Sequence, residues 1–131
     1  MDRILIVDDE FLIRYTLEEG LKDRGYDAYS AATVEEGLEF VRKYHPGVLL
    51  LDNLLENSVG MDEIVNFKNA DEELQVIMMT AYGSVSQAVE ATKRGAYDYI
   101  LKPFDVDEID MLIKRCLEQK RNRDSLVFLK G

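Results

Sequence analysis

Short apolar segments and amphipathic segments alternate five times along this chain of 131 residues, and this alternation limits the folds it can adopt. The apolar segments have the length and the β-branched character of strands, the second more weakly, and span residues 3–7, 27–31, 48–51, 76–79 and 97–101. The segments that follow them have helical spacing or capping signals: residues 11–24, a helix opened by Thr33, residues 61–69, a helix from Ser84 to near Gly95, and a last helix from Asp105. Strands that alternate with helices form right-handed crossovers, so the pattern predicts a parallel sheet.

The length and the number of repeats predict one α/β domain with a five-stranded, doubly wound parallel sheet of strand order 2-1-3-4-5. The first, third and fourth strands are apolar at nearly every position, which indicates that helices cover both faces of the sheet. In this order the first and third strands are neighbours where the winding reverses. Ligands of such sheets bind beyond the carboxyl ends of the strands at that point.

Charged residues stand where three of these strands end. Asp8 and Asp9 follow the first strand, Asp52 follows the third, and Lys102 follows the fifth. The predicted order places the three aspartates together and brings Lys102 and the hydroxyl of Thr80 to the same edge. The sequence therefore predicts a site built from these side chains.

Three carboxylates in one crevice need compensation, because two unit charges about 4 Å apart repel by about 4 kcal/mol at an effective dielectric of about 20. Proton sharing and a divalent cation are the two routes, and oxygen ligands suit Mg²⁺. Lys102 offers a point charge to a phosphoryl oxygen, and Thr80 can donate a hydrogen bond to the same group. Asp52, which stands alone between the paired acids and Lys102, is the candidate nucleophile for an acyl phosphate.

Composition excludes other classes of function. No apolar run reaches the length of about 18 residues needed to span a membrane, and the N-terminus lacks a signal-peptide layout. The single cysteine favours a cytoplasmic location, since no internal disulfide can form. A net charge of −10 argues against direct nucleic-acid binding by this domain, although residues 114–123 are locally basic.

The motifs at the strand ends resemble those of response-regulator receiver domains of two-component signalling. The matching pieces are Val7-Asp8-Asp9-Glu10, Leu50-Leu51-Asp52, Met79-Thr80-Ala81 and Tyr99-Ile100-Leu101-Lys102-Pro103-Phe104. The resemblance extends from Ile4 to about Glu118 and implies the flavodoxin-like receiver fold. It covers nearly the whole chain, and the four pieces in this order are specific.

The resemblance implies a phosphoacceptor domain that is not an enzyme beyond its own phosphorylation and dephosphorylation. Asp52 would accept a phosphoryl group from a sensor histidine kinase. Asp8, Asp9, Asp52 and the backbone carbonyl of Leu54 would hold Mg²⁺, for which Mn²⁺ is a possible substitute. The Leu54 carbonyl is the least secure of these ligands.

The resemblance also implies how the domain signals. Thr80 and Tyr99 would form the switch pair, and the Lys102-Pro103 peptide bond would be cis, which proline makes less costly. Phosphorylation would change the face formed by the fourth helix, fifth strand and fifth helix. That change would control an output, with transcription favoured, and the same face is a possible homodimer interface.

Residues 81–84 and 95–99 are most like receivers of nitrogen-regulation-type activators, which usually precede an ATPase domain and a DNA-binding domain. We assign residues 1–122 to the receiver domain and residues 123–131 to a tail or the start of an interdomain linker. Downstream ATPase and DNA-binding domains are then expected partners if the chain is a fragment.

One segment departs from the family pattern. Residues 53–62 contain no proline, and Gly60 comes about three residues late, so the loop beside the metal site should be longer than usual. Leu54 and Tyr82 should flank the phosphoryl group. Both are bulky and uncharged, so neither orients water, and we expect slow self-hydrolysis.

Two other functions fit the fold. An aspartyl phosphatase of the haloacid-dehalogenase type also uses a strand-end aspartate with Mg²⁺, but it needs a second acid where this chain has Leu54. A flavin-binding carrier needs a phosphate loop after the first strand, where this chain has three acidic residues that would repel the ligand.

Overall fold

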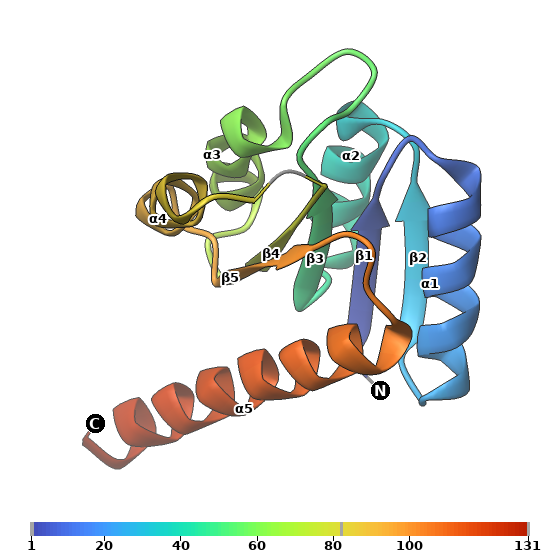
Figure 1. Ribbon diagram of the computed structural model, residues 1–131. Coiled ribbons are helices and arrows are strands. Elements are labelled where there is room, and N and C mark those ends of the chain that lie inside the picture. The colour runs from blue at the N-terminus through green and yellow to red at the C-terminus, as the bar shows by residue number, and fades with distance from the viewer. Residues whose placement is uncertain (1, 82, 131) are drawn as a thin grey trace.

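A computed structural model describes the backbone of residues 2–81 and 83–130 and the side-chain surroundings of described residues as far as 122 (Figure 1). The strands are β1 (Arg3–Val7), β2 (Asp27–Ala31), β3 (Val48–Asp52), β4 (Gln75–Thr80) and β5 (Asp98–Leu101). The helices are α1 (Phe11–Asp23), α2 (Val34–Tyr44), α3 (Gly60–Ala70), α4 (Val85–Lys93) and α5 (Val106–Lys130). The alternation read from the sequence is therefore confirmed.

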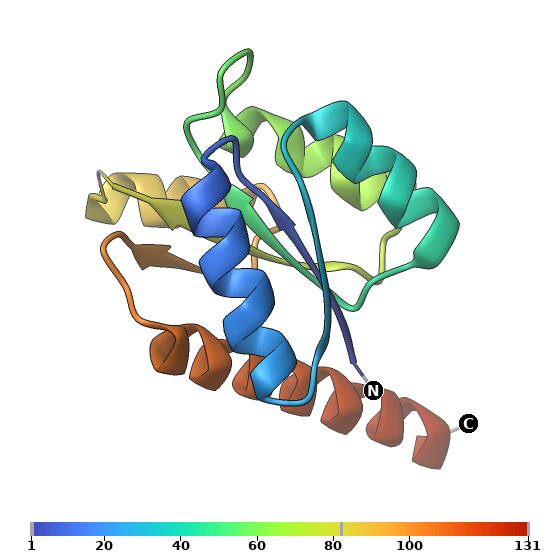
Figure 2. The same cartoon turned by 90° about the vertical axis from the view of Figure 1, so that its right-hand side faces the viewer.

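The five strands form one parallel sheet of order β2-β1-β3-β4-β5, as predicted. Val7 lies opposite Leu51, and Asp52 lies opposite Met79, so β1, β3 and β4 end close to one level. Figures 1 and 2 show α1 and α5 on one side of the sheet and α2 and α3 on the other. This registration brings the residues that follow the strands to one edge.

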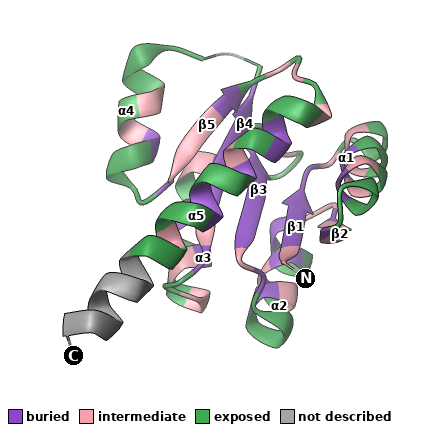
Figure 3. Ribbon diagram, turned by 90° about the horizontal axis from the view of Figure 1, so that it is seen from below, coloured by how far each residue is buried: buried purple, intermediate pink, exposed green. Residues whose placement is uncertain are grey.

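The core consists of two apolar layers, one on each face of the sheet. Alternation along β1 sends Ile4 and Ile6 into the layer beneath α1 and α5. Leu5 and Val7 enter the layer beneath α2, α3 and α4. Every residue of β3 is buried, as the purple central strands of Figure 3 show. Helices thus cover both faces, which confirms the reading of the apolar strands.

Two helices begin at the predicted capping residues. The side-chain oxygen of Thr33 accepts a hydrogen bond from the N–H of Glu36, and Ser84 accepts one from Gln87, each at 3.2 Å. These bonds satisfy N–H groups that have no partner within the helix. Both capping predictions are therefore confirmed.

Some boundaries differ from the prediction. The strand β5 begins at Asp98, one residue later than predicted, whereas β3 and β4 end on Asp52 and Thr80, where the polar residues stand at the strand ends. The helix α3 begins at Gly60, one residue earlier than expected. The helix α5 continues to Lys130, and the assignment of residues 123–131 to a tail or linker stays a prediction, because such a segment can be helical. In the part of the chain that the structure describes, no helix is both long and apolar enough to cross a lipid bilayer.

Candidate functional site

Side-chain alternation and strand order together position the acidic residues. Asp52 continues the alternation of Leu50, which packs in the layer beneath α1 and α5, and Asp8 continues that of Ile6. Since β1 and β3 are neighbours, the two carboxylates emerge side by side at the carboxyl edge. The structure thus places Asp8 and Asp52 next to each other, as predicted.

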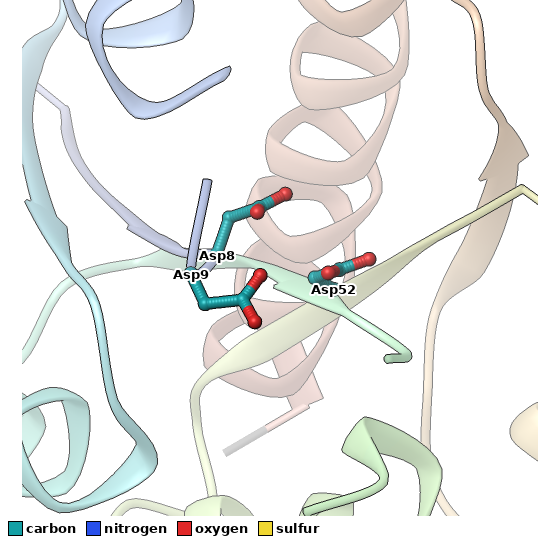
Figure 4. Close-up of side chains that lie close together, drawn as sticks. All are labelled: Asp8, Asp9 and Asp52. Carbon is teal, nitrogen blue, oxygen red and sulfur yellow. The ribbon is translucent and has the colours of Figure 1, made fainter. Parts of the chain in front are cut away.

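Asp8, Asp9 and Asp52 form a cluster in which one oxygen from each carboxylate lies within 4.8 Å of the others (Figure 4). Asp8 is fully buried and Asp52 is 4% exposed, whereas Asp9 is the most exposed of the three. The cluster is therefore open to solvent and to a partner through Asp9, while its other two members are shielded.

Lys102 joins this cluster from the end of β5. Its Nζ lies 3.1 Å from Oδ2 of Asp8 and 3.1 Å from Oδ1 of Asp52. The backbone N–H of Lys102 donates to the carbonyl of Thr80 at 2.7 Å, which fixes the chain beyond β5 against β4. The Lys102-Pro103 bond is cis, as expected. Lys102 thus supplies one positive charge to two buried carboxylates.

One lysine does not fully compensate the acids. Burial, and then the negative charge of Asp8, raises the pKa of Asp52 to about 6, although Lys102 acts in the opposite direction. Burial lowers the pKa of Lys102, but its bonds and charge interactions with Asp8 and Asp52 outweigh that effect and raise it. The site therefore holds excess negative charge at neutral pH.

Backbone and neighbouring groups fix Asp8. Its Oδ1 accepts the N–H of Glu10 at 2.9 Å, and its carbonyl accepts Nη1 of Arg14 at 2.7 Å. Its own N–H donates to the carbonyl of Ala31 at 3.2 Å, which links the end of β1 to β2. These contacts leave Oδ2 as the oxygen that faces Lys102.

The donor set fits a magnesium ion. Mg²⁺ binds oxygen atoms at about 2.0 to 2.1 Å in an octahedron, so its ligand oxygens lie about 3 Å apart, or about 4.2 Å when opposite. Carboxylate oxygens within 4.8 Å of one another reach those spacings through small side-chain movements. A divalent cation also supplies the charge that Lys102 alone does not.

The loop after Asp52, which is predicted to be longer than the family pattern, has a defined form. Leu54 and Val59 pair in an antiparallel bridge. The bonds that make this bridge run from Gly60 N–H to the Asn53 carbonyl at 2.7 Å and from Leu55 N–H to the Ser58 carbonyl at 3.0 Å. Leu54 and Val59 thus form a non-hydrogen-bonded pair, and the carbonyl of Leu54 points away from Val59.

Asn53 and Gly60 are residues that the sequence analysis did not assign to the site. The side-chain oxygen of Asn53 accepts the N–H of Met61 at 3.0 Å, and the backbone N–H of Asn53 donates to the Met79 carbonyl at 2.9 Å. A Cβ atom on Gly60 would overlap the carbonyl oxygen of Asp52. One signal in the sequence could have identified Asn53. The helix that starts at Gly60 is not preceded by a residue of a capping type, whereas an asparagine, which is such a type, stands seven residues before that start.

The proposed switch residues lie on the other face of the sheet. Thr80 is buried at the end of β4, and Tyr99 is half-buried against the layer beneath α2, α3 and α4. Met78 lies opposite Tyr99 in the β4–β5 register, so Tyr99 and Thr80 share one face two positions apart. Tyr82, expected beside the phosphoryl group, lies outside the described residues.

Comparisons with known proteins agree with this geometry. A family model described as the response regulator receiver domain matches residues 4–114. The chain is 38% identical over 121 residues to sporulation initiation phosphotransferase F of Bacillus subtilis, covering 92% of this chain and 98% of that protein. It is 36% identical over 129 residues to the nitrogen assimilation regulatory protein NtrX of Azorhizobium caulinodans, covering 97% of this chain but 28% of that protein. The solution structure of the beryllofluoride-activated NtrC4 receiver domain dimer superimposes with a TM-score of 0.86 at 34% identity, covering 92% of this chain and 99% of that one.

Proposed function

The chain belongs to the response regulator receiver domains of two-component signalling, and we propose on this basis that Asp52 is its phosphoacceptor. One observation carries the proposal. Asp52 is a buried strand-end carboxylate within 3.1 Å of a lysine and beside two other carboxylates. The family is regulatory, so the product is a phosphorylated protein rather than a released metabolite.

The proposed reaction is transfer from a phosphohistidine of a sensor kinase. One carboxylate oxygen of Asp52 attacks the phosphorus, and the P–N bond breaks with its electron pair left on the imidazole. Asp52 is ionised in most molecules above its pKa of about 6 and then attacks as the more nucleophilic carboxylate anion. Lys102, already 3.1 Å from Asp52, turns its charge to a phosphoryl oxygen.

Asp8, Asp9, Asp52 and the carbonyl of Leu54 would hold Mg²⁺, with Mn²⁺ as a substitute. The cation would neutralise charge on the transferring phosphoryl group. The cluster of three carboxylates supports this assignment, and so does the direction of the Leu54 carbonyl away from its bridge partner. Asp9, the most exposed ligand, provides the side from which the cation enters.

A kinase that reaches Asp52 would also touch the start of α1. Phe11, Leu12 and Tyr15 are 69%, 70% and 54% exposed, and the first of them comes two residues after Asp9 in the chain. Exposed apolar side chains of this size beside a reaction site favour a protein partner. We therefore assign this face to docking of the kinase. The proposed location is the cytoplasm, where ATP is available to phosphorylate such kinases.

The output face is proposed to consist of α4, β5 and α5. Phosphorylation would draw Thr80 toward the new phosphoryl oxygens, and Tyr99 would follow on the same sheet face. Large apolar residues lie exposed on all three elements: Val85, Val89, Leu101 and Met111. A homodimer through this face would cover these four side chains. Phosphorylation would then shift the population of molecules toward the conformation that dimerises.

The output itself lies beyond the receiver, which we assign to residues 1–122. More than two thirds of the NtrX protein lies outside the region that this chain matches. If the chain is a fragment, we propose that residues 123–131 lead to ATPase and DNA-binding segments that control transcription. The chain, with its net charge of −10, would not bind nucleic acid directly through its receiver domain.

The test is phosphorylation by a small donor such as phosphoramidate. Intact mass should show one added phosphoryl group with Mg²⁺ and none with EDTA. Asp52→Asn should remain unmodified, whereas the exposed-charge control Glu39→Gln should be modified like the wild type. Modification of Asp52→Asn to the wild-type extent would refute the assignment.

A further inference from the structure

The helix α3 begins without a capping side chain of its own. Its N-cap residue is Val59, which makes no side-chain capping bond. The first N–H groups of a helix have no partner within it and need one from elsewhere. The N–H of Met61 finds that partner in the side-chain oxygen of Asn53, eight residues upstream, at 3.0 Å. The cap of α3 is therefore supplied by the residue that follows the phosphoacceptor.

Asn53 is held to two elements at once. Its backbone N–H donates to Met79 in β4 at 2.9 Å, and its carbonyl accepts the N–H of Gly60 at 2.7 Å. Gly60 approaches the backbone of Asp52 so closely that no side chain fits there. The start of α3 is thus seated against the residues on which the site is built.

We propose that the side-chain amide of Asn53 is a positioning group for the metal site. It fixes the peptide that carries the Leu54 carbonyl by tying the backbone of residue 53 to the first turn of α3. The carbonyl of Leu54 directly follows that fixed residue, and its direction depends on the backbone angles that these bonds hold. The role rests on the proposed magnesium site and assigns Asn53 no contact with the cation.

The chain offers a matched control. Thr33 caps α2 with a side-chain bond of 3.2 Å, comparable in type to the bond that Asn53 makes to α3. Thr33→Ala removes one capping bond, and Thr33 makes no described hydrogen bond to Asp52, Asn53 or Leu54, although it lies beside residues 55–58 of the loop. A purely structural role for Asn53 predicts the same modest loss of stability in both variants and no special effect on the cation.

The experiment measures the affinity of the full chain for Mg²⁺ alone by titration calorimetry. Loss of a group that orients a ligand typically weakens metal binding by about 10-fold to 100-fold. We expect about a tenfold higher dissociation constant for Asn53→Ala and a change of less than about twofold for Thr33→Ala. Asn53→Asp keeps an oxygen acceptor for the Met61 N–H and should bind Mg²⁺ at least as tightly as the wild type.

The outcomes separate the possibilities. Equal affinities for Asn53→Ala and the wild type, equal losses in Asn53→Ala and Thr33→Ala, or weak binding by Asn53→Asp would each overturn the inference. Wild-type protein that binds no Mg²⁺ would refute the proposed function instead. If Asn53→Ala fails to fold, Asn53→Gln, whose amide oxygen is displaced by one methylene, carries the same expectation of weakened binding.

Discussion

Replacing Asp52 by Asn should make the metal-free protein more stable at neutral pH, although it removes a group from an ion pair. Burial and the charge of Asp8 penalise the ionised form of Asp52 more than Lys102 favours it, so its pKa stands at about 6 rather than the ordinary 3.8. Asp8, whose Oδ2 lies 3.1 Å from Nζ of Lys102, should remain the partner of Lys102 in the variant. The substitution therefore removes a net repulsion.

The magnitude follows from linkage between protonation and folding. A carboxyl whose pKa is raised on folding stabilises the protein below its unfolded pKa and loses that contribution as pH rises through the folded value. The upward shift of about two pKa units corresponds to about 3 kcal/mol above pH 7. Near pH 5 about half of that penalty is present. The advantage of Asp52→Asn should therefore grow with pH from 5 to 8.

Urea unfolding in EDTA at several pH values measures this directly. Glu39→Gln, an exposed change of the same charge, controls for the net charge of −10. Added Mg²⁺ should reverse the order, because an ion that binds only the folded state stabilises the wild type more than the variant. An Asp52→Asn protein that is less stable than the wild type in EDTA at pH 8 would refute the reasoning.

Three further substitutions and the lifetime of the phosphoprotein give four more predictions. Gly60→Ala should lower the free energy of unfolding by about 1 to 3 kcal/mol in urea titrations, because its Cβ would overlap the Asp52 carbonyl; an unchanged midpoint would contradict that seating. Lys102→Met should slow phosphorylation by phosphoramidate about 100-fold in mass-spectrometric time courses, and a rate near that of the wild type would remove its role. Tyr26→Phe loses the buried 2.6 Å bond to Asp110 and should lose about 1 to 2 kcal/mol at pH 7. Burial alone would raise the pKa of Asp110, but the hydrogen bonds from Tyr26 and Lys114 outweigh burial and hold that pKa below its ordinary value. The stability that the Tyr26 bond contributes should therefore be lost as the pH falls and the carboxyl is protonated, and urea unfolding at low pH would measure that loss. Hydrolysis of the phosphoprotein should be slow, because Leu54, which is 55% exposed, has no charge with which to orient an attacking water molecule. Loss of the phosphoryl group within seconds, followed by intact mass, would contradict this.

The sheet was predictable from sequence because its signals are local and repeated. Five apolar segments set the strands, and helices between them allow few parallel topologies. The acidic site was equally accessible, since Asp8 and Asp52 follow strands that become neighbours in the predicted order. Lys102 followed for the same reason, as the residue after the last strand.

The loop beside the site was less accessible, for a physical reason. The bond from Met61 to Asn53 spans eight residues and joins segments that have no shared periodicity. The need for Gly60 arises from its approach to the Asp52 carbonyl, which depends on how α3 docks on β3. Sequence indicated that the loop was longer than usual but not which of its residues are held.

The bridge between Leu54 and Val59 separates the tip of this loop, residues 55–58, from the acidic cluster at Asp52. The turn from Leu55 to Ser58, closed by their mutual backbone bonds, lies beyond the bridge. Because doubling the length of a flexible loop costs only about 0.6 kcal/mol, this turn is the place where insertions would be tolerated. A reporter peptide placed there would sit beside the proposed phosphorylation site without displacing Asp52.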